Sequence, residues 1–378
     1  MNKYSGDYII LGPAFPFRGG ISNTNHELIQ AIDSKNKKNL IITFKTLYPK
    51  LIFPGKNQYN DEQKPKKINI ERHLSSYNPL TWIKTAKRIN QLNPKAVIFR
   101  YYTPFLAPAY FFVSKFIKTD IKRIAIVDNW LPHEKFFLDN FLNKLFGTKM
   151  HGFITLSKNV SNQIKLNFNK PLLTLFHPIN QNLPLPISKI NARKLLNWSN
   201  ERKTILFYGL IRKYKGLDLL IKSLNEEPLK KIKLHLVISG EFYESKKKYL
   251  RIISENKLEE KVTIFNKFLT NEMTQKLFCG SDAVMQTYHS STQSGVTPLA
   301  YFYNTPILVT NLDGLKDPIE KDNSGIISEK STYDISKNIL EILKTKNLNN
   351  FSKNIKSAKS NYKWSKFVLE LEKFISNL

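Results

Sequence analysis

Apolar runs that suit β-strands alternate with segments of helical periodicity along almost the whole chain of 378 residues. This alternation is typical of βα units, in which each helix carries the chain back so that the next strand pairs in parallel. It therefore predicts an α/β protein. The expected strands are 8–11, 40–44, 96–100, 123–127, 152–156, 172–175, 204–208, 233–239, 262–265, 283–286 and 307–310.

A linker separates two runs of this alternation. Residues 177–188, HPINQNLPLPIS, contain three prolines and no regular period, which is typical of a connection between domains. At roughly 150 residues per domain, two domains also suit the length. We therefore expect two Rossmann-like domains, 1–180 and 181–361. Beyond them, residues 362–378 carry apolar side chains at spacings of three and four, which predicts an amphipathic helix with a stripe to cover.

The charge of the chain is strongly positive. Lys and Arg number 59 against 30 Asp and Glu, a formal net charge of +29. Such an excess suits a nucleic-acid-binding protein, the non-enzymatic alternative, but the sequence has no recognisable recognition helix, RNP-like aromatic strand or zinc module. A lysine- and asparagine-rich composition explains the excess equally well. Charge alone therefore assigns no function.

The sequence favours a cytoplasmic setting. Cys279 is the only cysteine, so the chain can form neither an internal disulfide nor a Cys-based zinc cluster. The apolar segment near the N-terminus is too short for a signal-peptide core. The most lipid-like stretch, 104–117, contains two prolines and Lys115 and falls short of the ~20 apolar residues of a spanning helix.

The turn after the first expected strand contains tandem glycines, Gly19 and Gly20. Glycines at a strand-to-helix junction let a ligand approach the backbone, and the helix start favours an anion. A phosphate or sugar could therefore dock there, and a plain tight turn is the alternative. Thr24 and Glu27 match a capping box, which would start the helix after Ile21. The spacing G-x-G-x-x-G is absent, which disfavours NAD.

A basic loop follows the expected strand 204–208. Arg212 and Lys215 come directly after that strand, and Gly216 precedes a segment of helical period. Cations at the carboxyl edge of a parallel sheet are well placed for a diphosphate, which arginine can bind in bidentate fashion. A solvated basic loop is the alternative.

A polar loop follows the expected strand 283–286 and leads into another helical segment. The candidate anion-binding residues at that helix start are Gln293, Ser294, Gly295 and Val296, because unpaired N–H groups at a helix start and its dipole favour a phosphate without a metal. A serine nucleophile at Ser294 is the rival interpretation. It is disfavoured because the G-x-S-x-G pattern is missing.

The loop after the expected strand 123–127 contains His133 and Glu134. A histidine at this edge could orient or deprotonate a hydroxyl, although a loop histidine is more often only a hydrogen-bonding residue. The aromatic segment that follows, 136–146, has the period of a helix. Burial in a core is the favoured interpretation of this segment, and an interfacial membrane helix is the alternative.

Two of these segments carry a resemblance to a known family. YGLIRKYKGLDLLIKSL, residues 208–224, and SDAVMQTYHSSTQSGVTPLAYFYNTPILVTNLDGL, residues 281–315, resemble in order and separation the GT-B fold glycosyltransferases of family 4. This group 1 type elongates bacterial surface polysaccharides. The resemblance extends over most of the chain, and the GG turn and the NWLPHE loop fall where the family has acceptor-side elements.

The resemblance implies a GT-B architecture of two Rossmann-like domains with a crevice between them. The helix 362–378 would cross back onto the N-terminal domain. The expected reaction is transfer of a sugar from a nucleotide diphosphate to a hydroxyl of a glycan or lipid-linked acceptor, with retention and without a metal or other cofactor. The enzyme would lie on the inner face of the cytoplasmic membrane.

Individual residues acquire roles from the same resemblance. Arg212 and Lys215 would neutralise the donor diphosphate, and the backbone at 294–296 would hold its distal phosphate. Gly19 and Gly20 would line the crevice. The remaining roles concern the acceptor side: His133 would contact the transferred sugar or the acceptor, with Glu134 beside it.

The chain departs from the family where two glutamates, eight positions apart, are common. Ser291 and Leu299 stand at the corresponding places, so contacts to sugar hydroxyls must come from other groups. Thr292, Gln293 and His289 are candidates.

Two alternatives stay open. A sugar-nucleotide 2-epimerase shares the architecture and would turn over its substrate without an acceptor. The basic residues could instead serve an anionic membrane surface if they share one face of the N-terminal domain. The cations in question are Lys115, Lys118, Lys122, Arg123, Lys135 and Lys144.

Overall fold

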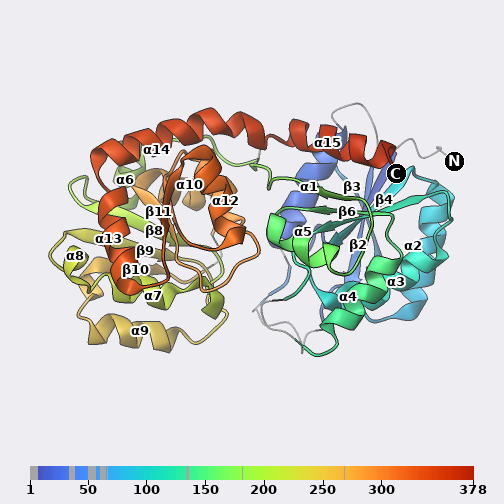
Figure 1. The fold of residues 1–378 in the computed structure, drawn as a ribbon, viewed down its shortest axis with the longest axis horizontal. Helices are drawn as coiled ribbons and strands as arrows, with labels where there is room; N and C mark the ends of the chain where they lie inside the picture. The colour runs from blue at the N-terminus through green and yellow to red at the C-terminus, as the bar shows by residue number, and fades with distance from the viewer. Residues whose placement is uncertain are drawn as a thin grey trace. The chain divides into compact units, whose positions relative to one another are not determined.

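The computed structural model describes residues 7–33, 39–49, 57–59, 65, 67–132, 136–180, 182–267 and 269–378. The chain divides into two compact units (Figure 1). Unit 1 comprises Met1–Pro178 with Lys363–Leu378, and unit 2 comprises Ile179–Tyr362. Both units are α/β, as the alternation of apolar runs and helical periods predicts.

Unit 1 contains, over its described residues, a seven-stranded parallel sheet in the order β3-β2-β1-β4-β5-β6-β7. Its strands are β1 Tyr8–Leu11, β2 Leu40–Thr46, β3 Asn69–Ser75, β4 Ala96–Tyr101, β5 Lys122–Val127, β6 Gly152–Thr155 and β7 Leu172–Thr174. Its helices are α1 Gly20–Asp33, α2 Pro79–Leu92, α3 Ala107–Phe116, α4 Asp139–Thr148, α5 Lys158–Lys165 and α15 Trp364–Ser376.

Unit 2 contains, again over the described residues, a six-stranded parallel sheet in the order β10-β9-β8-β11-β12-β13. Its strands are β8 Lys203–Tyr208, β9 Leu234–Ser239, β10 Val262–Phe265, β11 Ala283–Gln286, β12 Ile307–Thr310 and β13 Gly325–Ser328. Its helices are α6 Lys189–Leu196, α7 Leu217–Ser223, α8 Glu227–Lys230, α9 Lys246–Glu255, α10 Asn271–Gly280, α11 Val296–Phe302, α12 Asp313–Asp322, α13 Thr332–Ile342 and α14 Thr345–Ala358.

The strand order reverses once in each sheet, between β1 and β4 and between β8 and β11. Ligands of open parallel sheets bind outside the carboxyl ends of the strands at such a switch point. The segments singled out after β1, β8 and β11 in the sequence therefore follow strands that border a switch point.

Two strands were missed by the sequence pattern, β3 and β13, and both are edge strands. An edge strand pairs on one side only and need not be apolar on both faces. β3 reads NIERHLS and is partly exposed along most of its length. β13 begins at Gly325, where a Cβ would lie 1.7 Å from the carbonyl oxygen of Ile307, so only glycine fits there.

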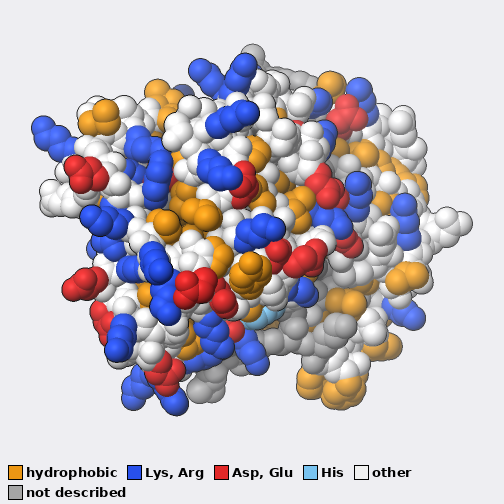
Figure 2. Space-filling model, turned by 60° about the vertical axis from the view of Figure 1, so that its left-hand side comes forward, with side chains coloured by type: hydrophobic (Ala, Val, Ile, Leu, Met, Phe, Trp, Pro, Cys, Tyr) orange, Lys and Arg blue, Asp and Glu red, His pale blue; other side chains and the backbone are white. Residues whose placement is uncertain are grey.

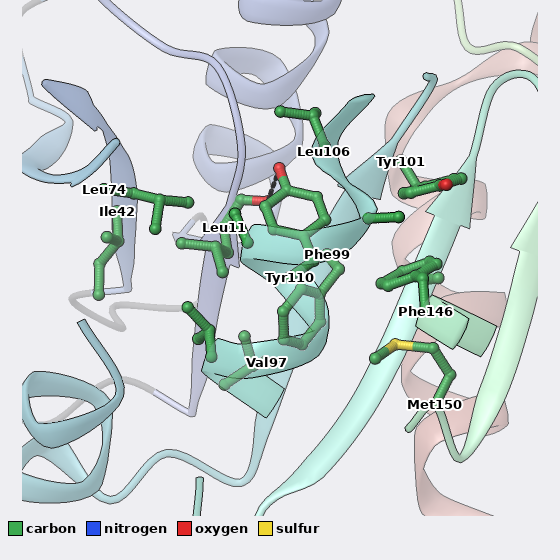
Figure 3. Packing of buried hydrophobic residues seen from close by; sticks show 14 of the residues in the cluster. Leu11, Ile42, Leu74, Val97, Phe99, Tyr101, Leu106, Tyr110, Phe146 and Met150 are labelled. Carbon is green, nitrogen blue, oxygen red and sulfur yellow. Dashed lines mark hydrogen bonds between the residues drawn. The ribbon is translucent and has the colours of Figure 1, made fainter. Parts of the chain in front are cut away.

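The core of unit 1 lies on both faces of its sheet. One cluster lies beneath α2, α3 and α4 (Figure 3), and Tyr101 stacks there on Phe146 with 4.1 Å between ring centroids. The hydroxyl of buried Tyr110 donates to the carbonyl of Leu11 at 3.3 Å, a bond drawn in Figure 3. Buried hydroxyls cost free energy unless they are hydrogen-bonded, so this bond ties α3 to the end of β1.

The other face of the sheet in unit 1 is covered by α1 and α15 (Figure 1). The expected amphipathic helix at the end of the chain is thus confirmed as α15, and its apolar stripe is buried on unit 1. Trp364 is buried, and its Nε1 donates to the Glu27 carboxylate at 2.9 Å. The predicted capping box is wrong because α1 begins at Gly20, and the Thr24 hydroxyl donates to the carbonyl of Gly20 at 2.7 Å.

We predict that Trp364→Ala lowers the free energy of unfolding by about 3–5 kcal/mol, the usual range for emptying a large buried aromatic site. The loss follows because Trp364 is 1% exposed and anchors α15 to α1. Urea unfolding followed by circular dichroism measures it. Leu369→Ala is the matched control, because Leu369 lies on the exposed side of the same helix. Equal losses in the two variants would show that α15 is not anchored by its buried stripe.

Candidate functional site

The site in unit 2 begins where the turns after β8 and β9 touch. Gly209 and Gly240 have φ of 100° and 146°, in the region that favours glycine. A Cβ on Gly240 would lie 2.0 Å from the carbonyl oxygen of Gly209, and the N–H of Gly209 donates to the carbonyl of Ser239 at 2.9 Å. The two strand ends are therefore held in direct backbone contact.

A second contact joins the loop after β8 to the loop after β11. Gly216 has φ of 63°, and a Cβ there would lie 1.9 Å from the carbonyl oxygen of Thr287. The Thr287 hydroxyl donates to the carbonyl of Gly216 at 2.9 Å, and the N–H of His289 donates to the carbonyl of Tyr214 at 2.7 Å. The structure thus brings together the loop after β8 and the loop after β11, which are some seventy residues apart in the sequence. The sequence pattern indicated each of them independently.

Lys215 lies in this junction as a buried cation. It is 8% exposed, and its Nζ is 5.5 Å from the ring centroid of Tyr288. A Cβ on Gly209 would come within 2.9 Å of that Nζ. Over the described residues, no carboxylate lies within ion-pair distance of it. Burial, and then the nearby charge of Arg212, lower the pKa of Lys215 to about 8.

Arg212 lies beside Lys215 but is exposed. Its guanidinium lies 5.0 Å from the ring centroid of Tyr243, which follows β9, a cation–π geometry that orients the side chain. A buried ammonium next to an exposed guanidinium, with no carboxylate partner in the described part of the chain, has the charge and donors that bind a phosphate.

The start of α11 completes the group. The Ser294 hydroxyl accepts from the N–H of Val296 at 3.2 Å and lies 3.3 Å from the Tyr288 hydroxyl. Gly295 is exposed and is the residue from which the helix starts. Val296 lies next to Gly209, because a Cβ added to Gly209 would be 3.8 Å from the Cγ2 of Val296. The Ser294 hydroxyl, one residue before the N-cap Gly295, thus already accepts from the N–H of Val296 in this structure, and the proposed anion contact of the 294–296 backbone stays a prediction.

Several polar groups at the site have unused hydrogen-bonding capacity. Gln286, at the end of β11, is fully buried and donates through Nε2 to the Thr297 hydroxyl at 3.0 Å. The buried Oε1 atoms of Gln286 and Gln293 have no hydrogen-bond partner among the described residues. Unpaired buried acceptors are costly, so both amides are candidates for ligand contacts.

Sequence reasoning missed Gln286, Tyr288 and Tyr243. All three lie at or just after the end of a strand, and that position is the signal that could have found them. His289, one of the candidate substitutes for the missing glutamates, lies 3.0 Å through Nε2 from the Asp218 carboxylate in the first turn of α7.

The glycine turn in unit 1 is open. A Cβ on Gly19 or Gly20 would have nothing within 4 Å, and Gly19 has φ of 122°. Nearby, a Cβ on Gly12 would lie 2.7 Å from the Cβ of Arg100, whose guanidinium forms a bidentate pair with the buried Asp128 at 2.6 Å. This pair was also missed.

Two of the predicted site residues, His133 and Glu134, lie outside the described residues, so their roles stay predictions. Within the described part of the chain, no group of three or more His, Cys, Asp or Glu side chains is placed to bind a metal ion. Lys and Arg side chains are spread among acidic ones on the face drawn in Figure 2 and do not form one stripe there.

Comparison with known proteins identifies a domain family for part of the chain. Residues 188–358 match the family described as glycosyl transferases group 1. An uncharacterized glycosyltransferase of Methanocaldococcus jannaschii is 26% identical over 180 residues, which is 46% of this chain and 45% of that protein. The match thus spans slightly less than half the length of that relative.

Solved structures resemble the chain over nearly its full length. Sucrose-phosphate synthase from Thermosynechococcus elongatus has a TM-score of 0.79 at 13% identity, with 98% of each chain covered. HepE from Anabaena, solved in complex with UDP-glucose, has a TM-score of 0.73 at 14% identity, with 98% of this chain and 100% of that one covered. The chain therefore has the GT-B fold, and the match of residues 188–358 supports a transferase of glycosyl groups.

We predict that Lys215→Met raises the free energy of unfolding near neutral pH by about 1–3 kcal/mol, because it replaces a buried, unpartnered charge by an apolar chain of similar shape. The native pKa of about 8 lies below the usual 10.5. The unfolded chain therefore binds more protons between these values, and the stability of the parent protein should rise with pH across that window. Urea titrations across this range test both statements.

The exposed neighbour Lys213 provides the matched control, Lys213→Met. It should change neither the stability at neutral pH nor its rise above about pH 8. If Lys215→Met destabilised the protein and left that rise unchanged, the lysine would be structural and the assignment of an anion site would fail.

Proposed function

We propose that the chain transfers a sugar from a nucleoside diphosphate donor to a hydroxyl of a glycan or lipid-linked acceptor, with retention of anomeric configuration. One observation carries the proposal: the Lys215 ammonium is buried at the switch point of unit 2 with no carboxylate partner in the described residues. A protein retains such a costly group where a ligand supplies the missing charge. A diphosphate supplies it.

The donor is supported by a relative of the same fold. HepE from Anabaena binds UDP-glucose, and the group 1 glycosyltransferase match covers the unit that holds Lys215 and Arg212. We therefore assign the donor diphosphate to Lys215, Arg212 and the 294–296 backbone. Gly19 and Gly20, and His133 with Glu134, are proposed for the acceptor side.

The proposed reaction breaks the bond between the anomeric carbon and the distal phosphate oxygen. It forms a bond between that carbon and the acceptor oxygen, and the hydroxyl proton passes to the departing phosphate. Negative charge develops on the diphosphate as the bond breaks, so the Lys215 ammonium and the Arg212 guanidinium stabilise the transition state more than the ground state. No metal is assigned a role.

Neutral amides take the place of the missing glutamates in this proposal. Ser291 and Leu299 cannot bind sugar hydroxyls as carboxylates do, and Ser291 donates its hydroxyl to the carbonyl of Gln293 at 3.0 Å. The unpaired Oε1 atoms of Gln286, at the end of β11, and of Gln293, in the loop that follows, are acceptors. We assign the sugar hydroxyl contacts to them, with His289 and Thr292 nearby.

We also propose a setting, surface polysaccharide or glycoconjugate synthesis on the inner face of the cytoplasmic membrane. None of the described helices is long and apolar enough to cross a bilayer. A lipid-linked acceptor would place the substrate at the membrane surface.

We predict that Arg212→Ala weakens UDP binding about 10- to 100-fold and abolishes detectable transfer, because it removes a charge-assisted hydrogen bond to the diphosphate. The fold should be unchanged because Arg212 is exposed. Calorimetry with UDP and a product assay with UDP-sugars measure the two effects, and Lys213→Ala is the control. Unchanged transfer by Arg212→Ala would refute the phosphate assignment, and turnover of a nucleotide sugar without acceptor would favour an epimerase.

A further inference from the structure

The helical layer formed by α2, α3 and α4 on one face of unit 1 is rich in exposed apolar side chains. α2 contacts α3 through the stacked rings of Trp82 and Phe112, 5.4 Å apart, and Lys149, just after α4, lies 5.3 Å from the ring centroid of Phe111 in α3. The exposed apolar residues of the layer and its preceding turns are Tyr77, Leu80, Ile83, Phe112, Phe116, Phe136, Phe137, Leu138 and Phe141. We call this set the apolar layer surface.

The most exposed part of the apolar layer surface is the start of α4. Phe137 is 81% exposed, and Phe136 and Phe141 are each about 60% exposed. Asp139 is buried and accepts from the N–H of Phe136 at 2.7 Å, so the turn that presents these rings is fixed by a hydrogen bond. Core burial, the favoured interpretation of this segment in the sequence, is wrong for these three rings. It holds for Phe146, which is fully buried.

Basic side chains outnumber acidic ones on this layer. Across residues 77–92, 107–118 and 136–149 the sole acidic residue is the buried Asp139. The basic residues of these segments are Lys84, Lys87, Arg88, Lys115, Lys118, Lys144 and Lys149. Arg88 is paired with Glu71 of β3 at 2.7 Å, which leaves the six lysines. On the opposite face, α15 carries the two signs in equal number, Glu370 and Glu372 with Lys366 and Lys373.

Not every basic residue expected at a membrane belongs to this face. Lys122 Nζ donates to the carbonyl of Ile375 at 2.8 Å, and Arg123 hydrogen-bonds to His151 at 2.9 Å, so both are engaged at the amino end of β5. Lys135 lies outside the described residues. Lys115, Lys118 and Lys144 remain exposed beside the apolar layer surface.

We infer that the apolar layer surface docks on an anionic lipid bilayer, with the Phe136, Phe137 and Phe141 rings inserted at the level of the headgroups. Exposed aromatic and aliphatic side chains flanked by lysines suit an interface that is apolar below and negatively charged at its surface. Lysine stems can lie along the apolar region while their ammonium groups contact lipid phosphates. The inference is drawn from unit 1 alone and does not depend on donor binding.

Two other occupants fit less well. A second copy bound through the same patch would place the six lysines of one copy against those of the other, which is repulsive. A single-stranded nucleic acid would be bound by rings and cations, but Leu80, Ile83 and Leu138 offer it neither stacking nor hydrogen bonds. A bilayer uses all of these groups.

Vesicle sedimentation of the full chain tests the inference. We predict that the protein sediments with vesicles of phosphatidylcholine and phosphatidylglycerol much more than with phosphatidylcholine alone. The double variant Phe137→Ser, Phe141→Ser should lose at least about tenfold in partition per ring, since each buried aromatic side chain contributes at least that much. Leu166→Ser is the matched control, because Leu166 is 87% exposed at the end of α5, outside the layer.

A second readout keeps the test independent of how the serine variant folds. Cys279 is buried, so Phe137→Cys provides a single exposed thiol for an environment-sensitive dye. Its emission should shift to the blue with anionic vesicles, whereas dye on Leu166→Cys should not respond. UDP binding by the serine variant should equal that of the parent, which separates this inference from the donor assignment.

Several results would overturn the inference. They include equal sedimentation with both kinds of vesicle, no sedimentation at all, or parent-like partition of the serine variant. A dimer that the serine variant abolishes would identify a second copy as the occupant. A blue shift of the dye emission on adding a single-stranded oligonucleotide, with no shift on adding vesicles, would identify a nucleic acid as the occupant.

Discussion

The strands of both sheets pair in parallel, so each connection must cross a face of the sheet before the next strand begins. Every strand in a unit consequently ends at the same edge. This constraint places Arg212 and Lys215, which follow β8, in one neighbourhood with Ser294, which follows β11. Glycines make the neighbourhood tight, because Gly216 and Gly240 let backbone approach backbone where any Cβ would collide.

The buried Lys215 shows how stability and binding oppose each other at this edge. An ammonium without a carboxylate nearby is costly to bury, and its pKa falls accordingly. Two buried arginines of the chain are paired instead, Arg100 with Asp128 and Arg193 with Asp282. The contrast between these satisfied pairs and Lys215 is the reason to propose that Lys215 binds a ligand. The two faces of unit 1 also differ. The layer of α2, α3 and α4 leaves aromatic rings such as Phe137 exposed, whereas α15 buries Trp364 and Phe367.

Much of the fold followed from local pattern. The strands β1, β11 and β12 agree with the predicted ranges to the residue, because buried parallel strands read as continuous apolar runs. The edge strand β10 agrees as well, since its sequence VTIF is β-branched and aromatic although it is only partly buried. The edge strands β3 and β13 did not, since one free side removes that requirement. The capping box predicted from Thr24 and Glu27 was wrong for a different reason. The Glu27 carboxylate accepts a hydrogen bond from Trp364, 337 residues away along the chain. A local sequence motif carries no information on so distant a partner.

The sequence by itself determined the α/β class, the amphipathic last helix and the strand ends after which charged and polar residues gather. These depend on periodicity and on neighbours in the chain. The tertiary structure decided that Lys215 is buried without a carboxylate among the described residues, that the Tyr288 ring borders it, and that Phe137 is exposed while Phe146 is buried. Burial and pairing depend on which distant segments pack together, and helical or strand periodicity carries no information on that choice.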